Sequence, residues 1–491
     1  MNLIDITKRK ILFIGFGGVA KCTLDYLYKY FKYDINKVYI VDKCKDQFYG
    51  PMINKIKHRL HVSINATNFE TILNDNHFNQ GDIIIDLSTG TSTYYFIRKC
   101  LELGINYINT SIEDGDDPFY GTSIDMQHKM VRQIFNEFKK THKIKSNIMV
   151  ECGQNPGLIQ HYILYAFNKL QQMKYKTHKN DYSRATLTKM IDIYKVGTVF
   201  CSEIDNMILN KKIKNDGNII YNTWSVSGLL DEGYDKIELS VGIKNKYIKP
   251  IIPSKMIDTK KMDILPKYPN QGYKVVFLKE QGMSNTLTSI CPILNDKGEI
   301  IYKNYKGHLI HHGETFEIAR FFDKKAPFMT YVYKINRYAE ESINNFFLNN
   351  PMTDDVDLSL KINNKCGSFK VLDNINKTKN DRFFGHDSIG CTIFCGEKKV
   401  ERAFWCGSIL SDTDDNVNPN YTPTIIQVVA GVISGLSYIM EPKHKNYGLL
   451  EPCDLETEYV LERAIPLLGK FFFTEIPYEH LKDFSFEYKR K

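Results

Sequence analysis

Apolar positions in the first part of the chain fall into short runs that alternate with stretches of helical spacing. Residues 11–14 are continuously apolar and lead into glycines, after which Leu24, Leu27 and Phe31 recur at helical spacing. Further apolar runs occupy residues 38–41, 61–64, 82–87, 106–109 and 147–150. Strands that are apolar throughout are typical of parallel sheets, because helices cover both faces. The pattern therefore predicts an α/β fold with a doubly wound parallel sheet.

The pattern changes after Gly157. A stretch rich in Lys, Gln and Asn at residues 171–181 precedes alternating, strand-like segments, which predict a mixed α+β domain. Residues 424–440 are apolar, rich in small side chains and preceded by Pro423, as in a helix buried against other helices. We expect a first domain at 1–156, an α+β domain at 157–420 and a C-terminal helical segment, 421–491, that packs back on the first domain.

A glycine-rich turn follows the first predicted strand. Its sequence, Gly15-Phe-Gly17-Gly18-Val19-Ala20, fits the pattern G-x-G-x-x-A. The first glycine of this pattern permits a tight turn, the second leaves room for a pyrophosphate, and the small last residue lets helix and strand pack closely. Because the turn lies between a predicted strand and a predicted helix, we expect a Rossmann-type dinucleotide site. The alternative is a glycine turn with a purely structural use.

Polar residues at the ends of later strands extend the predicted cofactor site. Asp42 closes the second strand, where a carboxylate binds the adenosine ribose and repels a 2′-phosphate, so that NAD is preferred over NADP. Lys43 and Lys45 weaken this preference. Ser88 and Thr89 follow the fourth strand and offer hydroxyls to the nicotinamide ribose, unless their loop only caps a helix.

Carboxylates, an amide and a tryptophan form a second group of candidate residues. Trp224 is one of two tryptophans, and Glu232 follows it eight residues later. A π face beside a carboxylate suits an ammonium or iminium group. Three further polar residues follow expected strands, namely Glu113, Asn155 and Glu203. Taken singly, each residue has an ordinary explanation: the tryptophan as a core ring, the asparagine as part of an Asn-Pro-Gly turn, and the glutamates as solvated acids. Taken together, they predict a pocket for a cationic substrate.

Composition narrows the class of protein. The 491 residues are 43% hydrophobic and 25% charged, which is typical of a globular enzyme with two or three domains. The net charge of +8 is spread along the chain, with 65 basic and 57 acidic residues, and predicts no nucleic-acid surface. The eleven cysteines include no C-x₂-C pair, so no structural metal is expected. No apolar run reaches the roughly 18 residues of a spanning helix. We expect a cytoplasmic protein with reduced thiols and no membrane contact.

Three motifs together resemble those of bacterial-type homospermidine synthases, which belong to the saccharopine dehydrogenase-like group of Rossmann enzymes. They are Gly-Phe-Gly-Gly-Val-Ala, Cys-Gly-Gln-Asn-Pro-Gly and Asn-Thr-Trp-Ser-Val-Ser-Gly-Leu-Leu-Asp-Glu-Gly, of which the third is the most specific. Residues 386–390 and 427–435 keep the family order, so the resemblance spans nearly the whole chain.

The resemblance implies a homodimer that holds NAD tightly and uses residues 157–420 for substrate binding and dimerisation. Such an enzyme oxidises putrescine to an imine, lets a second amine displace ammonia, and returns the hydride; spermidine is a further candidate substrate. The residues that correspond by motif are Trp224 for cationic intermediates, Glu232 and Glu203 for amine ends, Glu113 and Asn155 for the inner pocket, and Asp387.

Two positions depart from the family pattern. Gly90 stands where the family has an aspartate, and the family's active-site histidine is not evident in residues 277–285, so that Glu280, His311 or His312 are the candidates to replace it. Two other functions stay open. A saccharopine or carboxyspermidine dehydrogenase-like reductase would need cationic residues to bind an α-carboxylate. A catalytically degenerate protein would bind NAD or a polyamine without turnover.

Overall fold

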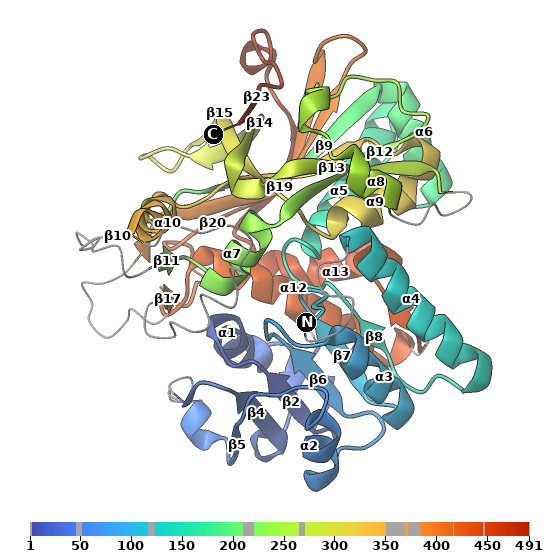
Figure 1. Cartoon of the computed structure of the whole chain (residues 1–491), viewed down its shortest axis with the longest axis vertical. Coiled ribbons are helices and arrows are strands. Elements are labelled where there is room, and N and C mark those ends of the chain that lie inside the picture. The colour runs from blue at the N-terminus through green and yellow to red at the C-terminus, as the bar shows by residue number, and fades with distance from the viewer. Residues whose placement is uncertain are drawn as a thin grey trace. The chain divides into compact units, whose positions relative to one another are not determined.

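Two compact units make up the part of the chain that the structure describes. The computed structural model describes residues 2–45, 52–115, 123–209, 220–264, 271–349, 369–371, 383–415, 417–444 and 447–490. The first unit consists of residues 1–158 and 425–465, and the second consists of residues 159–424 and 466–491 (Figure 1). The chain therefore passes from one unit to the other at three places, after residues 158, 424 and 465.

The first unit contains a parallel sheet of seven strands within the described residues. Its order is β21-β8-β7-β6-β2-β4-β5, and every neighbouring pair is parallel. The chain proceeds from β2 to one side and later returns to the other, so the turn after β2 lies at the point where the strand order reverses, which is where such sheets bind ligands. The strands are β2 (Ile11–Ile14), β4 (Val38–Asp42), β5 (His58–His61), β6 (Ile83–Asp86), β7 (Asn106–Asn109), β8 (Ile148–Met149) and β21 (Leu449–Leu450).

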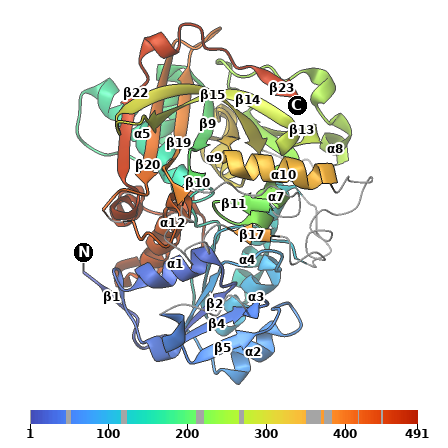
Figure 2. The same ribbon diagram turned by 90° about the vertical axis from the view of Figure 1, so that its left-hand side faces the viewer.

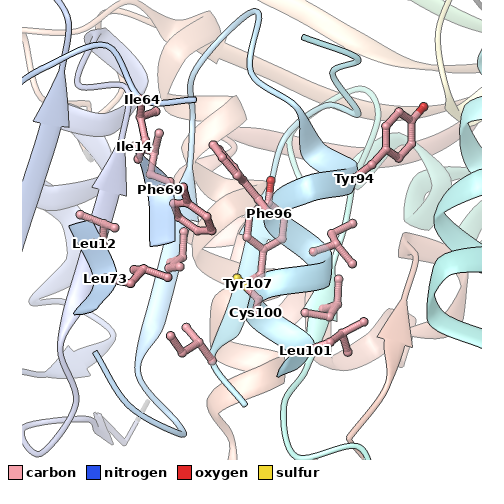
Figure 3. Close-up of a cluster of buried hydrophobic side chains, with 14 of the residues drawn as sticks. Leu12, Ile14, Ile64, Phe69, Leu73, Tyr94, Phe96, Cys100, Leu101 and Tyr107 are labelled. Carbon is pink, nitrogen blue, oxygen red and sulfur yellow. The ribbon is translucent and has the colours of Figure 1, made fainter. Parts of the chain in front are cut away.

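Helices cover both faces of this sheet. On one face, Phe69 of α2 and Phe96 of α3 pack against Leu12 and Ile14 of β2 in a core of buried side chains (Figure 3). On the other face, α12 approaches so closely that a Cβ added at Gly435 would lie 3.3 Å from Ile108 Cδ1. The helices are α1 (Gly18–Leu27), α2 (Phe69–Asp75), α3 (Thr93–Leu103), α4 (Ile124–Thr141), α12 (Pro423–Met440) and α13 (Thr457–Ala464); strands β1 (Ile4–Asp5) and β3 (Phe31–Lys32) pair separately.

The second unit contains a large mixed sheet. Its main path, as far as the described residues go, is β22-β20-β19-β9-β16-β15-β14-β23, and β12 pairs both β13 and β16. Figure 2 shows β22, β20, β19 and β9 of this sheet together with β15 and β14. The pair β9 and β16 is parallel, and the other pairs are antiparallel. The strands are β9 (Val196–Asp205), β12 (Lys236–Gly242), β13 (Tyr273–Gln281), β14 (Asn285–Leu294), β15 (Ile300–Ile310), β16 (Phe328–Lys334), β19 (His386–Cys395), β20 (Arg402–Ser411), β22 (Lys470–Glu475) and β23 (Tyr488–Arg490).

A second core lies on this sheet, with Phe200, Leu287 and Trp405 among its fully buried side chains. Two short strand pairs stand apart from the main sheet, β10 (Ile208–Leu209) with β18 (Phe383–Phe384) and β11 (Ile220–Asn222) with β17 (Phe369–Val371). The helices are α5 (Leu158–Tyr175), α6 (Arg184–Tyr194), α7 (Val226–Tyr234), α8 (Thr259–Ile264), α9 (Glu314–Phe322) and α10 (Arg337–Asn349).

The predicted doubly wound parallel sheet with a second mixed domain is confirmed, and two details differ. Strand β5 covers residues 58–61 instead of 61–64; it is the edge strand, and its side chains alternate between partly buried and exposed, so it carries no continuous apolar run. Residues 466–491, expected with the C-terminal helical segment, belong instead to the second unit, where β22 pairs with β20 and β23 pairs with β14.

Helix α12 is the one described helix that is long and apolar enough to cross a membrane, judged by length and composition. Most of it, 83% of the apolar window, is buried inside the protein. Its small residues explain the burial, because a Cβ added at Gly431 would lie 1.9 Å from the carbonyl oxygen of Gly153. The helix therefore has the surroundings expected of a core helix.

Candidate active site

The glycine turn after β2 has the geometry that a dinucleotide requires. Gly15 has φ +74°, and a Cβ there would lie 2.7 Å from Ser88 Cα, so only glycine fits. At Gly17 a Cβ would meet nothing within 4 Å, which leaves open space beside the turn. Helix α1 begins at Gly18 with no side-chain cap, so the N–H groups of its first turn, including those of Val19 and Ala20, are available to an anion. The residues present fit a pyrophosphate.

Asp42 ties the end of β4 to the glycine turn. Its Oδ2 accepts a hydrogen bond of 2.6 Å from the Phe16 N–H, and its Oδ1 accepts one of 2.6 Å from the Cys44 N–H. An ionised carboxylate has about four acceptor positions. Asp42 therefore keeps acceptors for ribose hydroxyls while it fixes the turn.

The loops after β6 and β7 contact each other through Glu113. Its Oε2 accepts a hydrogen bond from the Gly90 N–H at 3.2 Å, and its Oε1 accepts one from the Ser111 hydroxyl at 2.7 Å. The Glu113 carboxylate thus lies beside Gly90, the position where the resemblance led us to expect an aspartate. Thr89 is exposed at the tip of the same loop.

The hydroxyl of Ser88 faces the sheet. It lies 2.5 Å from Asp86 Oδ1, to which it donates, and 2.9 Å from Thr91 Oγ1. Burial raises the pKa of Asp86, while the bonds from Ser88 and Tyr107 lower it. Asn155 is partly buried in the turn after β8.

In the second unit, carboxylates gather at the carboxyl end of β9. Glu203 and Asp205 lie on β9, and Asp387 of β19 stands opposite Asp205 in the strand register. Tyr333 of β16 is in register with Glu203, and the neighbouring Tyr331 hydroxyl donates a 2.5 Å hydrogen bond to Glu203 Oε2. The three acids are at most 4% exposed. They share one face of the sheet with the two tyrosine rings.

His312 joins two further carboxylates to this group. Its Nε2 lies 2.9 Å from Glu232 Oε2, its Nδ1 lies 3.3 Å from Glu314 Oε2, and its ring centroid is 4.9 Å from that of Tyr331. Burial opposes protonation of His312, but Glu232 and Glu314 outweigh it and raise its pKa well above the ordinary value. We call Glu203, Asp205, Asp387, Glu232 and Glu314 the acidic cluster.

Of the three residues that the sequence offers in place of the family's histidine, only His312 contacts Glu232. The Nδ1 of His311 lies 3.0 Å from the Lys236 carbonyl oxygen. Glu280 pairs with Arg490 at 3.2 Å. His312 follows β15, eighty residues beyond Glu232 in the chain, so no local motif indicates the contact.

Trp224 lies in the turn that leads into α7, the helix that carries Glu232. Its Nε1 donates a 3.2 Å hydrogen bond to the Tyr333 hydroxyl, which places the ring next to the acidic cluster. Ser225 caps the helix by accepting from the Gly228 N–H at 3.1 Å. A Cβ at Gly228 would lie 2.8 Å from the Trp224 ring, so this glycine makes room for it.

Burial and mutual repulsion shift the titration of the acidic cluster. Burial raises the pKa of Glu203 to about 8, with Asp205 adding to the rise and the Tyr331 bond opposing it. Burial likewise raises the pKa of Asp205 to about 6, against bonds from Thr223, Met207 and Asn336. Burial, Glu203 and Asp205 raise the pKa of Asp387 well above its usual range. A cation bound beside the acidic cluster would relieve the repulsion between its carboxylates.

The structure thus brings together the predicted residues within each unit. In the second unit, one group contains the predicted residues Glu203, Trp224, Glu232 and Asp387. The sequence did not indicate three further members of this group, Glu314, Tyr331 and Tyr333. In the first unit the glycine turn, Asp42, Glu113 and Asn155 lie at the carboxyl ends of parallel strands. No group of His, Cys, Asp and Glu in the described residues has the arrangement of a metal site.

Fold and glycine turn define the class of the first unit. Residues 11–146 match the family model of the saccharopine dehydrogenase NADP binding domain. The first unit accordingly has a Rossmann-type fold and is similar, over these residues, to an NAD(P)-binding domain.

Over nearly its whole length the chain is similar to homospermidine synthases, which confirms the resemblance predicted from the three motifs. It is 22% identical over 484 residues to the homospermidine synthase of Mesorhizobium japonicum, with 95% of this chain and 90% of the relative covered. It is 22% identical over 477 residues to that of Blastochloris viridis, with 94% and 89% covered. The fold matches the crystal structure of Legionella pneumophila homospermidine synthase in complex with NAD, with a TM-score of 0.77, 20% identity and coverage of 98% of this chain and 94% of that one.

Proposed function

We propose that this protein is a homospermidine synthase-like enzyme that binds NAD and transfers an aminobutyl group between diamines, with putrescine as main substrate and spermidine as a further one. The observation that carries the proposal is the acidic cluster with its aromatic rings. Within the described residues, no Lys or Arg forms an ion pair with a carboxylate of this cluster. A flexible diamine cation complements such a group in charge and shape.

The proposed reaction is balanced within one turnover. When bound, NAD would supply the acceptor for a hydride from the carbon next to one amine of the diamine and would donate the same hydride back at the end. Between these transfers the substrate carbon is an iminium carbon, to which the amine of a second diamine adds, and ammonia leaves with the electron pair of the broken C–N bond. The returned hydride gives a secondary amine. Two putrescine molecules thus yield one homospermidine and one ammonia without net oxidation.

Side chains of the second unit have roles that follow from their charge and shape. Glu232 and Glu203 bind the protonated amine ends through charge-assisted hydrogen bonds. The Trp224 ring stabilises the iminium cation through its π face. His312, held between Glu232 and Glu314, moves a proton to or from an amine nitrogen.

Residues of the first unit serve the cofactor. Gly17 and Asp42 receive the pyrophosphate and the adenosine ribose, with NAD preferred over NADP. Glu113 and Asn155 serve the nicotinamide end, and Asp387 adds to the field of the acidic cluster in the second unit. We further propose that the protein is a cytoplasmic homodimer, which a mass measurement in solution checks.

The direct test incubates the purified protein with putrescine and catalytic amounts of NAD⁺. Mass spectrometry identifies the amines formed, and an enzymatic assay measures ammonia. We expect homospermidine and ammonia in equal amounts, with NAD regenerated. Absence of both products from folded, NAD-bound protein overturns the proposal.

Two alternatives give different results in the same assay. A saccharopine or carboxyspermidine dehydrogenase-like reductase would consume reduced cofactor in proportion to product and release no ammonia from putrescine. Its substrate carboxylate would face the acidic cluster, which repels it. A degenerate NAD- or polyamine-binding protein would bind putrescine and release nothing.

A further inference from the structure

A buried chain of charged side chains ends at the turn 151–157 of the first unit. His128 of α4 is 1% exposed; its Nε2 lies 3.1 Å from Glu151 Oε2, and its Nδ1 lies 2.9 Å from Glu451 Oε1. Arg132, one turn further along α4, places Nε and Nη2 at 3.0 and 2.6 Å from the two oxygens of Glu451. Two cations and two carboxylates thus alternate, and their formal charges cancel.

The imidazole in the middle of this chain is a cation at neutral pH. Burial alone would lower the pKa of His128, but Glu151 and Glu451 outweigh it and raise the pKa to about 10. Both ring nitrogens therefore carry protons and can donate. Buried ion pairs add little net stability because desolvation offsets their attraction, whereas loss of one partner is strongly disruptive. What such a chain supplies is a fixed geometry.

The backbone of the same turn is held from a second direction. The Glu151 N–H donates to Asn109 Oδ1 at 2.9 Å, and the Cys152 N–H donates to the Asn109 carbonyl oxygen at 2.8 Å. Glu151 has φ +57°, which is uncommon for a residue other than glycine. Side chain and backbone of the first residue of the turn are therefore both fixed.

Asn109 links the turn to the loop after β6. Its Nδ2 donates to the Tyr107 hydroxyl at 3.3 Å, which in turn donates to Asp86 Oδ2 at 2.7 Å, and the Ser88 hydroxyl donates to Asp86 Oδ1. This polar chain runs along the carboxyl ends of β6, β7 and β8. In a sheet of this strand order these strands serve the nicotinamide half of a dinucleotide, and β2 and β4 serve the adenosine half.

We propose that His128, Glu151, Glu451 and Arg132 are positioning residues that fix the turn 151–157, and with it Asn155, toward the nicotinamide half of the cofactor. The inference rests on the cofactor site of the proposed function and requires none of its amine chemistry. The two halves of the cofactor then depend on different residues, because the glycine turn and Asp42 serve only the ADP-ribose half.

The test compares NAD with ADP-ribose as ligands, using calorimetry on the full chain. The variant Glu151→Gln keeps the shape of the side chain and removes its charge. We expect its dissociation constant for NAD to rise about tenfold or more, while that for ADP-ribose stays within about twofold. Glu151→Asp keeps the charge and tolerates positive φ, so it should recover part of the NAD affinity.

Glu441→Gln is the matched control. Glu441 belongs to the same unit, and its Oε2 accepts from Arg463 Nη2 at 3.5 Å and from the Tyr459 hydroxyl at 3.1 Å. The substitution Glu441→Gln removes a carboxylate that is paired with an arginine but is not part of the chain that holds the turn. It should change neither the affinity for NAD nor that for ADP-ribose.

Equal weakening of NAD and ADP-ribose in Glu151→Gln, or no weakening of either, overturns the inference. If that variant does not fold, Arg132→Gln gives the same comparison, because the Arg132 side chain is 23% exposed at the outer end of the chain. Failure of the unmutated protein to release ammonia rejects the proposed reaction and leaves the comparison of the two ligands valid.

Discussion

The Phe16 N–H donates a 2.6 Å hydrogen bond to Asp42 Oδ2, so the carboxylate that we propose for the adenosine ribose also holds the glycine turn in place. If Asp42 selects the cofactor as proposed, one side chain couples that selectivity to the geometry of the turn. Losing a charge-assisted hydrogen bond of this kind costs about 1.5–3 kcal/mol. We expect Asp42→Asn to weaken NAD binding by roughly ten- to a hundredfold.

NADP binding should weaken less in Asp42→Asn, because the variant also removes repulsion of the 2′-phosphate. Asp34→Asn is the control, since Asp34 likewise accepts a backbone N–H, from Asn36 at 3.0 Å, outside the cofactor turn. Calorimetry with both nucleotides measures the ratio. An unchanged preference for NAD over NADP would remove Asp42 from the ribose site.

Gly15 and Gly17 should respond differently to an added side chain. A Cβ at Gly17 would point into open space, and Gly17 has an ordinary backbone conformation with φ −76°. The variant Gly17→Val should therefore fold, and it should not bind NAD because the valine side chain fills the space for the pyrophosphate. Gly15→Ala combines φ +74° with a contact of 2.7 Å to Ser88 Cα, so it should lose at least about 1–2 kcal/mol of stability. Thermal unfolding and calorimetry separate the two effects. NAD binding that survives in folded Gly17→Val would contradict the assignment of the turn.

Trp224 should matter for turnover and little for NAD binding. In the proposed reaction its ring acts on a cation that forms only after hydride transfer, and a desolvated cation–π contact of about 2 kcal/mol corresponds to roughly a thirtyfold change in rate. We expect this loss in Trp224→Ala and a smaller one in Trp224→Phe, which keeps a π face. Steady-state ammonia release provides the measurement. If both variants turn over normally, the ring is a packing residue only.

Replacing Glu232 by Gln preserves shape and removes one amine partner. Loss of a charge-assisted bond to a buried amine, on the order of 2–3 kcal/mol, should reduce amine turnover by about thirty- to two-hundredfold while NAD affinity barely changes. Asp235→Asn, which likewise preserves shape and removes a charge, is a suitable control, because Asp235 is an exposed acid just beyond the same helix. Equal effects of the two substitutions would show that net charge, and not the position of Glu232, is responsible.

Amine binding should release protons between about pH 6 and about pH 8. In this window Glu203, with its pKa raised to about 8, still carries a proton that a cationic amine displaces, whereas Asp205, with its pKa raised to about 6, contributes only near the lower end. Affinity for putrescine should therefore rise with pH across the window. Calorimetry in buffers of different ionisation enthalpy counts the protons, and Glu203→Gln should release fewer. A proton count of zero in the unmutated protein would contradict the raised pKa values.

The same shift predicts how stability depends on pH. A carboxyl whose pKa is raised in the folded state contributes stability that is fully present below its ordinary pKa of 4.5 and is lost as pH rises through about 8. Glu203→Gln, which resembles the protonated form, should therefore gain stability relative to the unmutated protein at pH 9 and show no gain at pH 5. Denaturant unfolding at the two pH values measures the difference.

Local chemistry was readable from the sequence, and contacts between distant segments were not. The turn at Gly15 and Gly17 and the position of Asp42 at the end of β4 could be predicted, because both depend on residues close in the chain. His312 was one of three candidates. Its contacts with Tyr331 and with Glu232 depend on the pairing of β15 with β16 and on the packing of α7, which no local pattern indicates.

Boundaries were the other weak point of the sequence interpretation. Residues 466–491 follow a helical stretch and were expected to stay with it. Their strands complete the edges of a sheet whose partners, β20 and β14, lie earlier in the chain, and no spacing within the segment indicates that pairing.

The division of the first unit between residues 1–158 and 425–465 has a consequence for synthesis. Strand β21 pairs with β8 through Leu449 and Leu450, and Gly431 of α12 packs on Gly153, so the nucleotide-binding unit lacks a strand and a covering helix until the ribosome has passed residue 465. An edge strand left unpaired in the nascent chain is a site for aggregation. The second unit, apart from its last 26 residues, 466–491, emerges entirely within that interval. During elongation the first 158 residues therefore remain without β21 and α12, and the edge of β8 stays unpaired while most of the second unit is synthesised.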